Sequence, residues 1–185
     1  MGAEVEVLES RLAEYVGVEH CICVSSGTDA LLIAMMALGL EPGDEVITCS
    51  FSFFATAEAI SAVGATPVFV DVRPDTFNLD PAGVLAKLSA ETRVVIPVHL
   101  FGLCADMDAL RAVVPGHVPI IEDAAQAIGT KSPLGPVGSL GAYGCFSFFP
   151  SRIPAVCELS CSVCSAHSAS SLIMCLTLQF VPFVI

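Results

Sequence analysis

Basic residues are scarce in this sequence. It has seven Lys and Arg against 19 Asp and Glu, which gives a formal net charge of −12 over 185 residues. Nucleic acids and anionic membranes select basic protein surfaces, so this charge argues against both as partners. An acidic balance is ordinary for a soluble enzyme, and a chain of this length can bury the core of one α/β domain.

The N-terminus also lacks the features of a secreted protein. Residues 1–9 contain no basic segment followed by an apolar run, so we predict no secretory signal peptide. The nine cysteines form no regular framework, and several lie in apolar runs such as Cys21–Cys23. Buried, reduced thiols are the natural interpretation, and they favour a cytoplasmic location.

Charge disappears near the end of the sequence. No Asp, Glu, Lys or Arg occurs from Leu159 to Ile185, whereas residues 1–151 hold 18 of the 19 acidic residues. We therefore predict one domain over residues 1–151, followed by an aberrant, apolar and Cys-rich tail over residues 152–185 that is not a domain.

Two other interpretations of this tail remain open. Cys157, Cys161 and Cys164 have the spacing of an iron–sulfur motif, although few residues follow them. The 18 uncharged residues from Ser168 to Ile185 reach the lower limit for a membrane span, but they lack basic flanks. An aggregation-prone segment explains both features, so we expect neither a metal site nor a membrane anchor.

Strand-like and helix-like segments alternate over residues 1–151. The apolar patterns predict strands at 20–24, 45–48, 67–70, 93–98, 118–121 and 144–148, and helices at 5–15, 30–38, 55–63, 81–88 and 106–113. Such alternation indicates an α/β fold in three α/β/α layers with a mostly parallel sheet. Residues 131–138 read as a loop or hairpin.

Polar residues follow several of these strands, at the edge where ligands of parallel sheets bind. Ser25-Ser-Gly-Thr-Asp29 opens a helix, where Gly27 permits close approach and the free N–H groups attract an anion. An ordinary N-cap at Ser26 or Thr28 would explain the same string. Asp123 follows another strand and could cap the next helix. His99 is expected to be a satisfied histidine in a loop.

Four segments together resemble one enzyme family. Ser26–Leu31, Ser52–Thr56, Glu122–Ala127 and Gly144–Arg152 are similar, in this order, to motifs of the DegT/DnrJ/EryC1/StrS aminotransferases, which use pyridoxal 5'-phosphate (PLP). The resemblance implies the large domain of a fold-type I PLP-dependent transferase. Its N-terminal part alone is represented, which we interpret as a fragment.

The resemblance also implies roles for individual residues. Gly27, Thr28 and Asp29 match the motif around the cofactor phosphate, and Ser147 adds a hydrogen bond to it. Phe53 stacks on the ring, with Phe54 in the core. Asp123 pairs with the pyridine nitrogen, and Gln126 neighbours the phenolic oxygen.

The position of the family's covalent lysine holds Arg152. In the family, this lysine follows the phosphate-binding serine by five residues, which from Ser147 leads to position 152. A guanidinium stays protonated and is a poor nucleophile, so Arg152 cannot replace the lysine. We therefore expect an inactive form.

The function implied by the resemblance is transfer of an amino group, usually from glutamate, to a nucleotide-linked keto sugar. Such reactions serve amino-sugar and polysaccharide biosynthesis, and the family's members are homodimers. The alternatives are a non-catalytic PLP-binding relic or regulatory fragment and, less well supported, an iron–sulfur protein.

Overall fold

The computed structural model describes residues 3–148 and, as backbone only, residues 162–166. Its helices are α1 (Ala3–Val16), α2 (Gly27–Ala37), α3 (Ala55–Ala62), α4 (Pro81–Lys87), the 3-10 turn η1 (Leu100–Gly102) and α5 (Met107–Val113). Its strands are β1 (His20–Cys23), β2 (Glu45–Cys49), β3 (Thr66–Val70), β4 (Thr92–Ile96), β5 (Ile121–Asp123), β6 (Lys131–Ser132), β7 (Gly135–Pro136), β8 (Tyr143–Ser147) and β9 (Ser162–Ala166). The predicted elements are present with boundary shifts of up to three residues; the strand predicted at 118–121 shares only Ile121 with β5.

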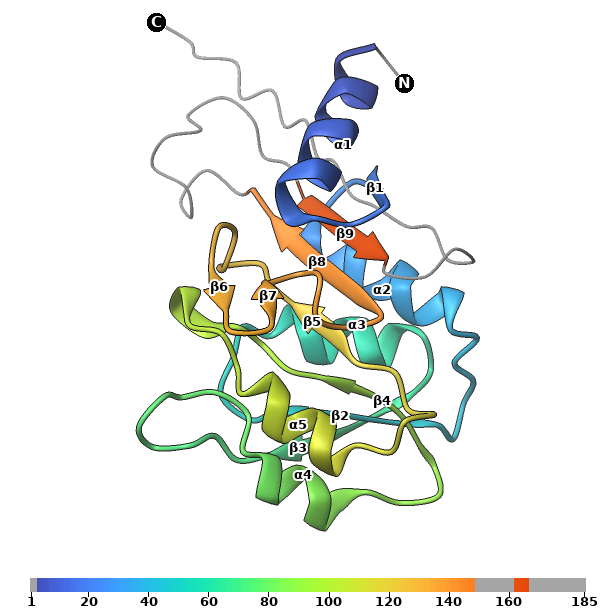
Figure 1. The fold of residues 1–185 in the computed structure, drawn as a ribbon. Coiled ribbons are helices and arrows are strands. Elements are labelled where there is room, and N and C mark those ends of the chain that lie inside the picture. The colour runs from blue at the N-terminus through green and yellow to red at the C-terminus, as the bar shows by residue number, and fades with distance from the viewer. Residues whose placement is uncertain (1–2, 149–161, 167–185) are drawn as a thin grey trace, which may run out of the picture.

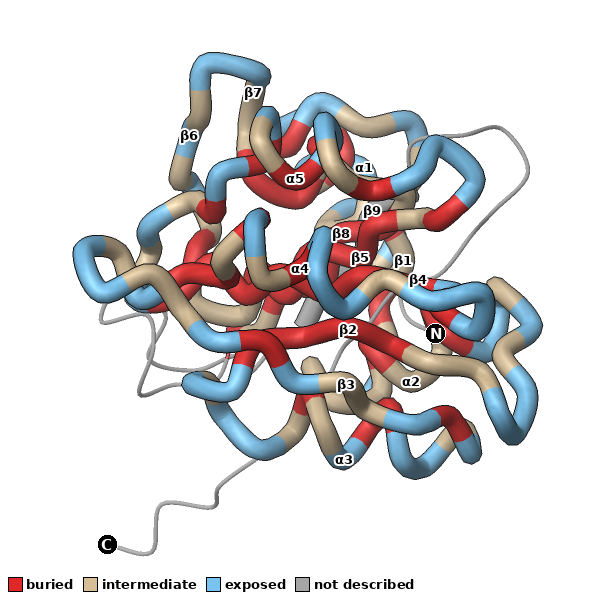
Figure 2. The backbone as a smooth tube through the Cα atoms, turned by 90° about the horizontal axis from the view of Figure 1, so that it is seen from below, coloured by how far each residue is buried: buried red, intermediate tan, exposed pale blue. Residues whose placement is uncertain are grey.

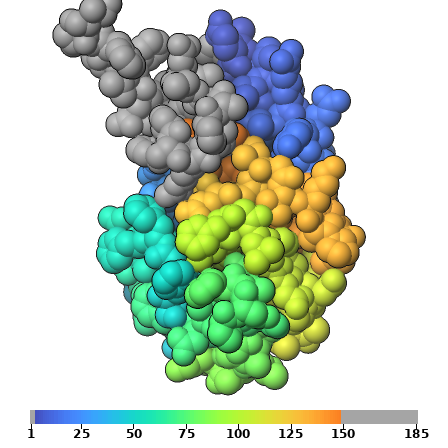
Figure 3. All heavy atoms as spheres, turned by 90° about the vertical axis from the view of Figure 1, so that its left-hand side faces the viewer, coloured from blue at the N-terminus to red at the C-terminus, as the bar shows by residue number. Residues whose placement is uncertain are grey.

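The strands form a mostly parallel sheet, as predicted. One part has the order β1-β9-β8-β5 and the other β3-β2-β4. Parallel bridges from Val95 to Ile120 and from Val98 to Asp123 join β4 to β5. The strand β9 is antiparallel to both of its neighbours. In Figure 1 the helix α1 lies at the β1 end and α4 at the opposite end, and Figure 3 shows the same separation.

The segment predicted to be a tail contributes β9. This strand pairs with β1 over His20–Cys23 and with β8 over Tyr143–Ser147. It therefore fills the position between two parallel strands, which no sequence pattern indicated. That residues 152–185 are not a domain stays a prediction.

Two apolar layers cover the two faces of the sheet. Side chains of β2 and β4 alternate between them: Val46, Val94 and Ile96 pack in one cluster with α2 and α3, and Ile47 and Val95 in the other with α4 and α5. Successive residues of a strand point to opposite faces, so a strand that is buried on both sides reads as a continuous apolar run. Figure 2 shows the backbone of β2 as buried along most of its length.

A buried carboxylate fastens the turn before β8 to the sheet. Glu122, in β5, is fully buried. Its Oε1 accepts hydrogen bonds from the N–H groups of Leu140 and Gly141, both at 2.6 Å, and its Oε2 accepts one from Gly138 at 2.8 Å. Arg111, in α5, donates to the carbonyl oxygen of Leu140 from the other side. The loop 138–141 is therefore held between β5 and α5.

His99 is the fourth partner of Glu122 and is fully buried, in agreement with the prediction of a satisfied histidine. Its Nε2 lies 2.9 Å from Oε2 of Glu122, and its Nδ1 accepts a hydrogen bond from the N–H of Ala105 at 3.0 Å. Burial lowers the pKa of His99, but the contacts with Cys104 and Glu122 outweigh it and raise the pKa to about 9. The hydrogen bond from the Ala105 amide nevertheless requires a lone pair on Nδ1, so in this geometry the ring carries its hydrogen on Nε2 and donates it to Glu122.

Two glycines permit the closest backbone approach in this region. A Cβ atom added to Gly144, in β8, would lie 2.4 Å from both Cα and the carbonyl oxygen of Gly138. Gly138 has a φ of 89° and would itself place a Cβ 2.2 Å from the ring of Phe146. The loop can therefore cross β8 only because both positions lack side chains.

We predict that Gly144→Ala destabilises the domain, because the obstructing atoms belong to the backbone and cannot rotate away. The loss should lie at or above the upper end of the about 1–3 kcal/mol typical of overpacking. Urea unfolding of the full chain measures it. Gly116→Ala is the matched control, since a Cβ there meets nothing within 4 Å. Equal midpoints for the two variants would contradict the close approach.

We also predict that Glu122→Gln is destabilising. A carboxylate offers acceptors to all four donors, whereas an amide turns its NH₂ group toward at least one of them. Breaking a buried charged network of this kind costs about 3 kcal/mol or more. Thermal or urea unfolding against Glu14→Gln, an exposed position in α1, gives the comparison. A Glu122→Gln protein as stable as this control would be evidence against the network.

Candidate functional site

A cavity of about 420 Å³ opens at the carboxyl ends of the parallel strands. It is lined by residues that follow or end β1, β2, β4, β5 and β8, together with the first turns of the helices after β1 and β2. The lining comprises Ser26, Gly27, Thr28, Leu31, Ser52, Phe53, Ala55, Val98, Asp123, Ala125, Gln126 and Ser147. Ligands of doubly wound sheets bind at this edge.

The cavity brings together six of the seven residues predicted to bind the cofactor. Gly27, Thr28, Phe53, Asp123, Gln126 and Ser147 all line it. Asp29 is absent from this lining, and it contacts the loop instead: its carboxylate accepts hydrogen bonds from Ser25 and from Ser26, the latter at 2.9 Å. Asp29 therefore shapes the loop that carries Gly27 and Thr28.

One end of the cavity suits an anion. Ser26 is the N-cap of α2, and its hydroxyl accepts a hydrogen bond from the N–H of Asp29 at 3.1 Å. Ser26 is therefore an ordinary N-cap, as one of the two interpretations predicted. Gly27 and Thr28 follow it in the first turn of α2, beside the cavity. Free N–H groups at a helix N-terminus attract phosphates, and the hydroxyls of Thr28 and Ser147 can add donors.

The cavity also contains Asp123, which is only 6% exposed. Its Oδ2 accepts a hydrogen bond from Thr56 Oγ1 at 2.7 Å, and its Oδ1 accepts one from the N–H of Ala125 at 3.2 Å. The backbone of Asp123 pairs with Pro97 and His99. The sequence analysis gave Thr56 no role of its own, although it is the last residue of the matched segment Ser52–Thr56, which is the signal that could have indicated it.

The thiol of Cys49 lies near this carboxylate. Burial raises its pKa to about 11, and the negative charge of Asp123 adds to the effect. Cys49 is therefore a protonated thiol at neutral pH and offers no nucleophile to the cavity.

Gln126 contacts a strained turn. Its Oε1 accepts a hydrogen bond from the N–H of Phe101 at 3.0 Å, and Phe101 adopts a left-handed φ of 53°. Thr130 donates to the carbonyl oxygen of the next residue, Gly102, at 2.8 Å. Both contacts fix the turn η1 against the segment that follows β5.

The assignment of Phe54 to the core is wrong. Phe54 is 71% exposed and is the N-cap residue of α3, whereas Phe53 lines the cavity although it is 63% exposed. Both side chains lie at the carboxyl edge of the sheet, beyond the layers of helices that cover its faces. An aromatic pair in sequence was therefore no evidence of burial here.

The remaining candidates fall elsewhere. Arg152, Cys157 and Cys161 lie outside the described residues, and Cys164 belongs to β9, of which only the backbone is described. In the part of the chain that the structure describes, no group of three His, Cys, Asp or Glu residues is placed to bind a metal ion. Over residues 3–148 and 162–166, no helix has the length and hydropathy needed to cross a membrane.

The chain is similar to sugar aminotransferases. It is 48% identical over 153 residues to a UDP-2-acetamido-2-deoxy-3-oxo-D-glucuronate aminotransferase of Pseudomonas aeruginosa, covering 82% of this chain and 43% of that enzyme. The crystal structure of Streptomyces venezuelae DesV with a ketimine intermediate matches with a TM-score of 0.84 and 39% identity, over 91% of this chain and 46% of that one. A sugar aminotransferase of Streptococcus pneumoniae in its PMP form matches with a TM-score of 0.85 and 30% identity, over 92% and 46%.

This chain therefore spans less than half the length of each of these relatives. The sequence model of one family matches residues 1–159. That match agrees with the order of the four motifs and with the cavity in which they meet, and the chain belongs to the DegT/DnrJ/EryC1/StrS aminotransferase family.

Proposed function

We propose that this chain binds the cofactor of a PLP-dependent aminotransferase that acts on a nucleotide-linked keto sugar in amino-sugar biosynthesis. One observation carries the proposal. Six residues from four separate motifs, matched in the sequence to a PLP site, converge on a single cavity at the carboxyl edge of the sheet. The named activities of the relatives support the sugar substrate.

The lining of the cavity suits both the phosphate and the ring of PLP. The first turn of α2 with Gly27 and Thr28, together with Ser147, offers donors to the phosphate. The apolar surfaces of Phe53 and Val98 suit an aromatic ring, and Asp123 suits a protonated pyridine nitrogen. When bound, PLP supplies an electron sink for amino transfer, which a carboxylate beside the ring nitrogen strengthens.

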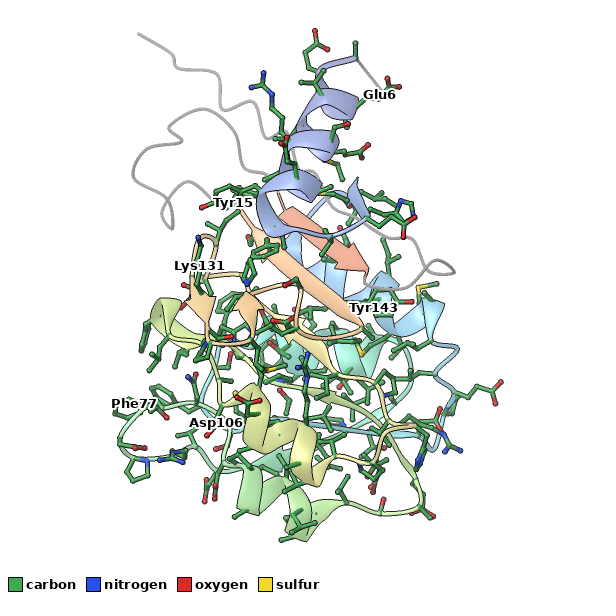
Figure 4. The ribbon with its side chains drawn as sticks, viewed as in Figure 1. Glu6, Tyr15, Phe77, Asp106, Lys131 and Tyr143 are labelled. Carbon is green, nitrogen blue, oxygen red and sulfur yellow. The ribbon has the colours of Figure 1, made fainter. Side chains whose placement is uncertain are left out.

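Two further parts of the proposal concern partners and location. Besides Phe53, the loops at this edge expose Phe51, Phe54, Phe77 and Phe101, and Figure 4 shows Phe77 on an outer loop. Exposed apolar groups of this extent are typical of protein interfaces, which supports a homodimer.

We assign glutamate as the amino donor from the family resemblance. The free thiols of Cys49 and Cys104 support a cytoplasmic location.

We further propose that the chain as written is a non-catalytic binder. Covalent attachment of PLP requires an unprotonated amine, and Arg152 at the lysine position provides none. Of the lysines that the structure describes, Lys87 and Lys131 are exposed and neither lines the cavity. Figure 4 shows Lys131 at the hairpin of β6 and β7.

We predict that Asp123→Asn weakens binding of pyridoxamine phosphate (PMP) by at least about tenfold, because a charged hydrogen bond to the ring nitrogen becomes a neutral one. PMP carries its own amine, so its binding does not depend on a lysine. Equilibrium dialysis of the full chain measures the affinity. Asp71→Asn is the control: Asp71 follows β3 and bonds to Ser50, outside the cavity. Unchanged affinity of Asp123→Asn would remove Asp123 from this role.

We also predict that PLP followed by borohydride leaves no stoichiometric pyridoxyl group on any lysine of the chain. Peptide mass mapping checks this result. The Arg152→Lys variant is the comparison, since it restores an amine at the family position. A stoichiometric adduct on Lys87 or Lys131 of the unsubstituted chain would contradict the proposal.

A further inference from the structure

We infer that Thr56 is a positioning residue for Asp123, whose hydroxyl sets the carboxylate in the orientation that a ring nitrogen requires. The inference rests on the proposed function, because it assumes that Asp123 pairs with the cofactor ring. None of the matched motifs assigned Thr56 a role.

The contact is short and buried. Thr56 is 3% exposed, and its Oγ1 lies 2.7 Å from Oδ2 of Asp123. An ionised carboxylate carries no hydrogen, so Thr56 is the donor. The Ala125 N–H donates to the other oxygen, Oδ1. The Thr56 hydroxyl and the Ala125 N–H therefore donate to different oxygens of Asp123, and together they fix the plane of its carboxyl group.

The Thr56 hydroxyl donates to Asp123, in β5, and not to a residue of its own helix. Thr56 is in the first turn of α3, whose N-cap Phe54 makes no side-chain cap bond. The hydroxyl nevertheless bonds to a residue 67 positions later in the sequence. A β-branched side chain has few rotamers, which keeps the donor in place.

The same bond links two of the proposed cofactor contacts. Phe53 lies three residues before Thr56, in the segment that enters α3, and both Phe53 and Asp123 line the cavity. The bond between Thr56 and Asp123 thus ties the start of α3 to the end of β5. The stacking aromatic and the carboxylate are held at a fixed separation as a result.

Three variants separate the hydroxyl from the shape of the side chain. Thr56→Val keeps the volume and removes the donor, and Thr56→Ser keeps the donor and removes the methyl group. Thr48→Val is the matched control: Thr48 is 1% exposed, and its hydroxyl donates to the carbonyl oxygen of Ile96 at 2.9 Å, away from the cavity lining.

Two ligands separate positioning from general damage. PMP has the ring nitrogen, and its 1-deaza analogue has a carbon in that place. We expect Thr56→Val to weaken PMP binding about tenfold, the loss expected for one hydrogen bond to a charged group. Its affinity for the deaza analogue should equal that of the unsubstituted chain. Thr56→Ser and Thr48→Val should bind both ligands normally.

Each other outcome overturns the inference. Unchanged PMP affinity in Thr56→Val would remove the role, and an equal loss for both ligands would show mere structural damage. If the valine variant does not fold by urea titration, Thr56→Ala is judged by the same two affinities. Asp123→Asn, measured in parallel, tests whether Asp123 pairs with the ring nitrogen. If this variant still prefers PMP over the deaza analogue, that assignment is wrong. If the unsubstituted chain binds neither ligand, the proposed function itself is wrong, and in both cases the inference about Thr56 is wrong as well.

Discussion

The edge of the sheet that carries the cavity depends on the hydrogen bonds of the buried Glu122 carboxylate. It accepts hydrogen bonds from three backbone N–H groups of the loop 138–141 and from His99. A full negative charge without water is tolerable only when its oxygens are satisfied in this way. The loop before β8 and the loop after β4, which contains Val98 and His99, are consequently fixed to β5.

Two adjacent carboxylates on β5 serve different purposes because a strand turns successive side chains to opposite sides. Glu122 points into the protein, where donors of the loop 138–141 enclose it. Asp123 points to the cavity, where Thr56 and Ala125 donate to it. The rigid network around Glu122 therefore supports the backbone from which Asp123 projects. A site held by a packed strand is more precise than one held by a loop.

The sequence predicted the α/β/α layers, the mostly parallel sheet and the strand ends that carry the cavity, because apolar runs and their periods report local burial. It did not indicate the contacts of Glu122 or Thr56, since their partners lie 16 to 67 positions away along the chain. The error at Phe54 has a similar cause: residue type suggests burial, but only the three-dimensional edge of the sheet decides it. The strand β9 was missed because its apolar pattern resembles the rest of an uncharged segment.

Binding and chemistry are separable in this fold. Five strand ends and two helix starts form the walls of the cavity in the described part of the chain. Phosphate, ring and nitrogen contacts depend on these walls, whereas covalent attachment and proton transfer depend on a lysine amine. Under the proposed function, Arg152 at the lysine position would remove the second set of steps and leave the first in place. The proposed function is therefore that of a cofactor-binding site without the family's nucleophile.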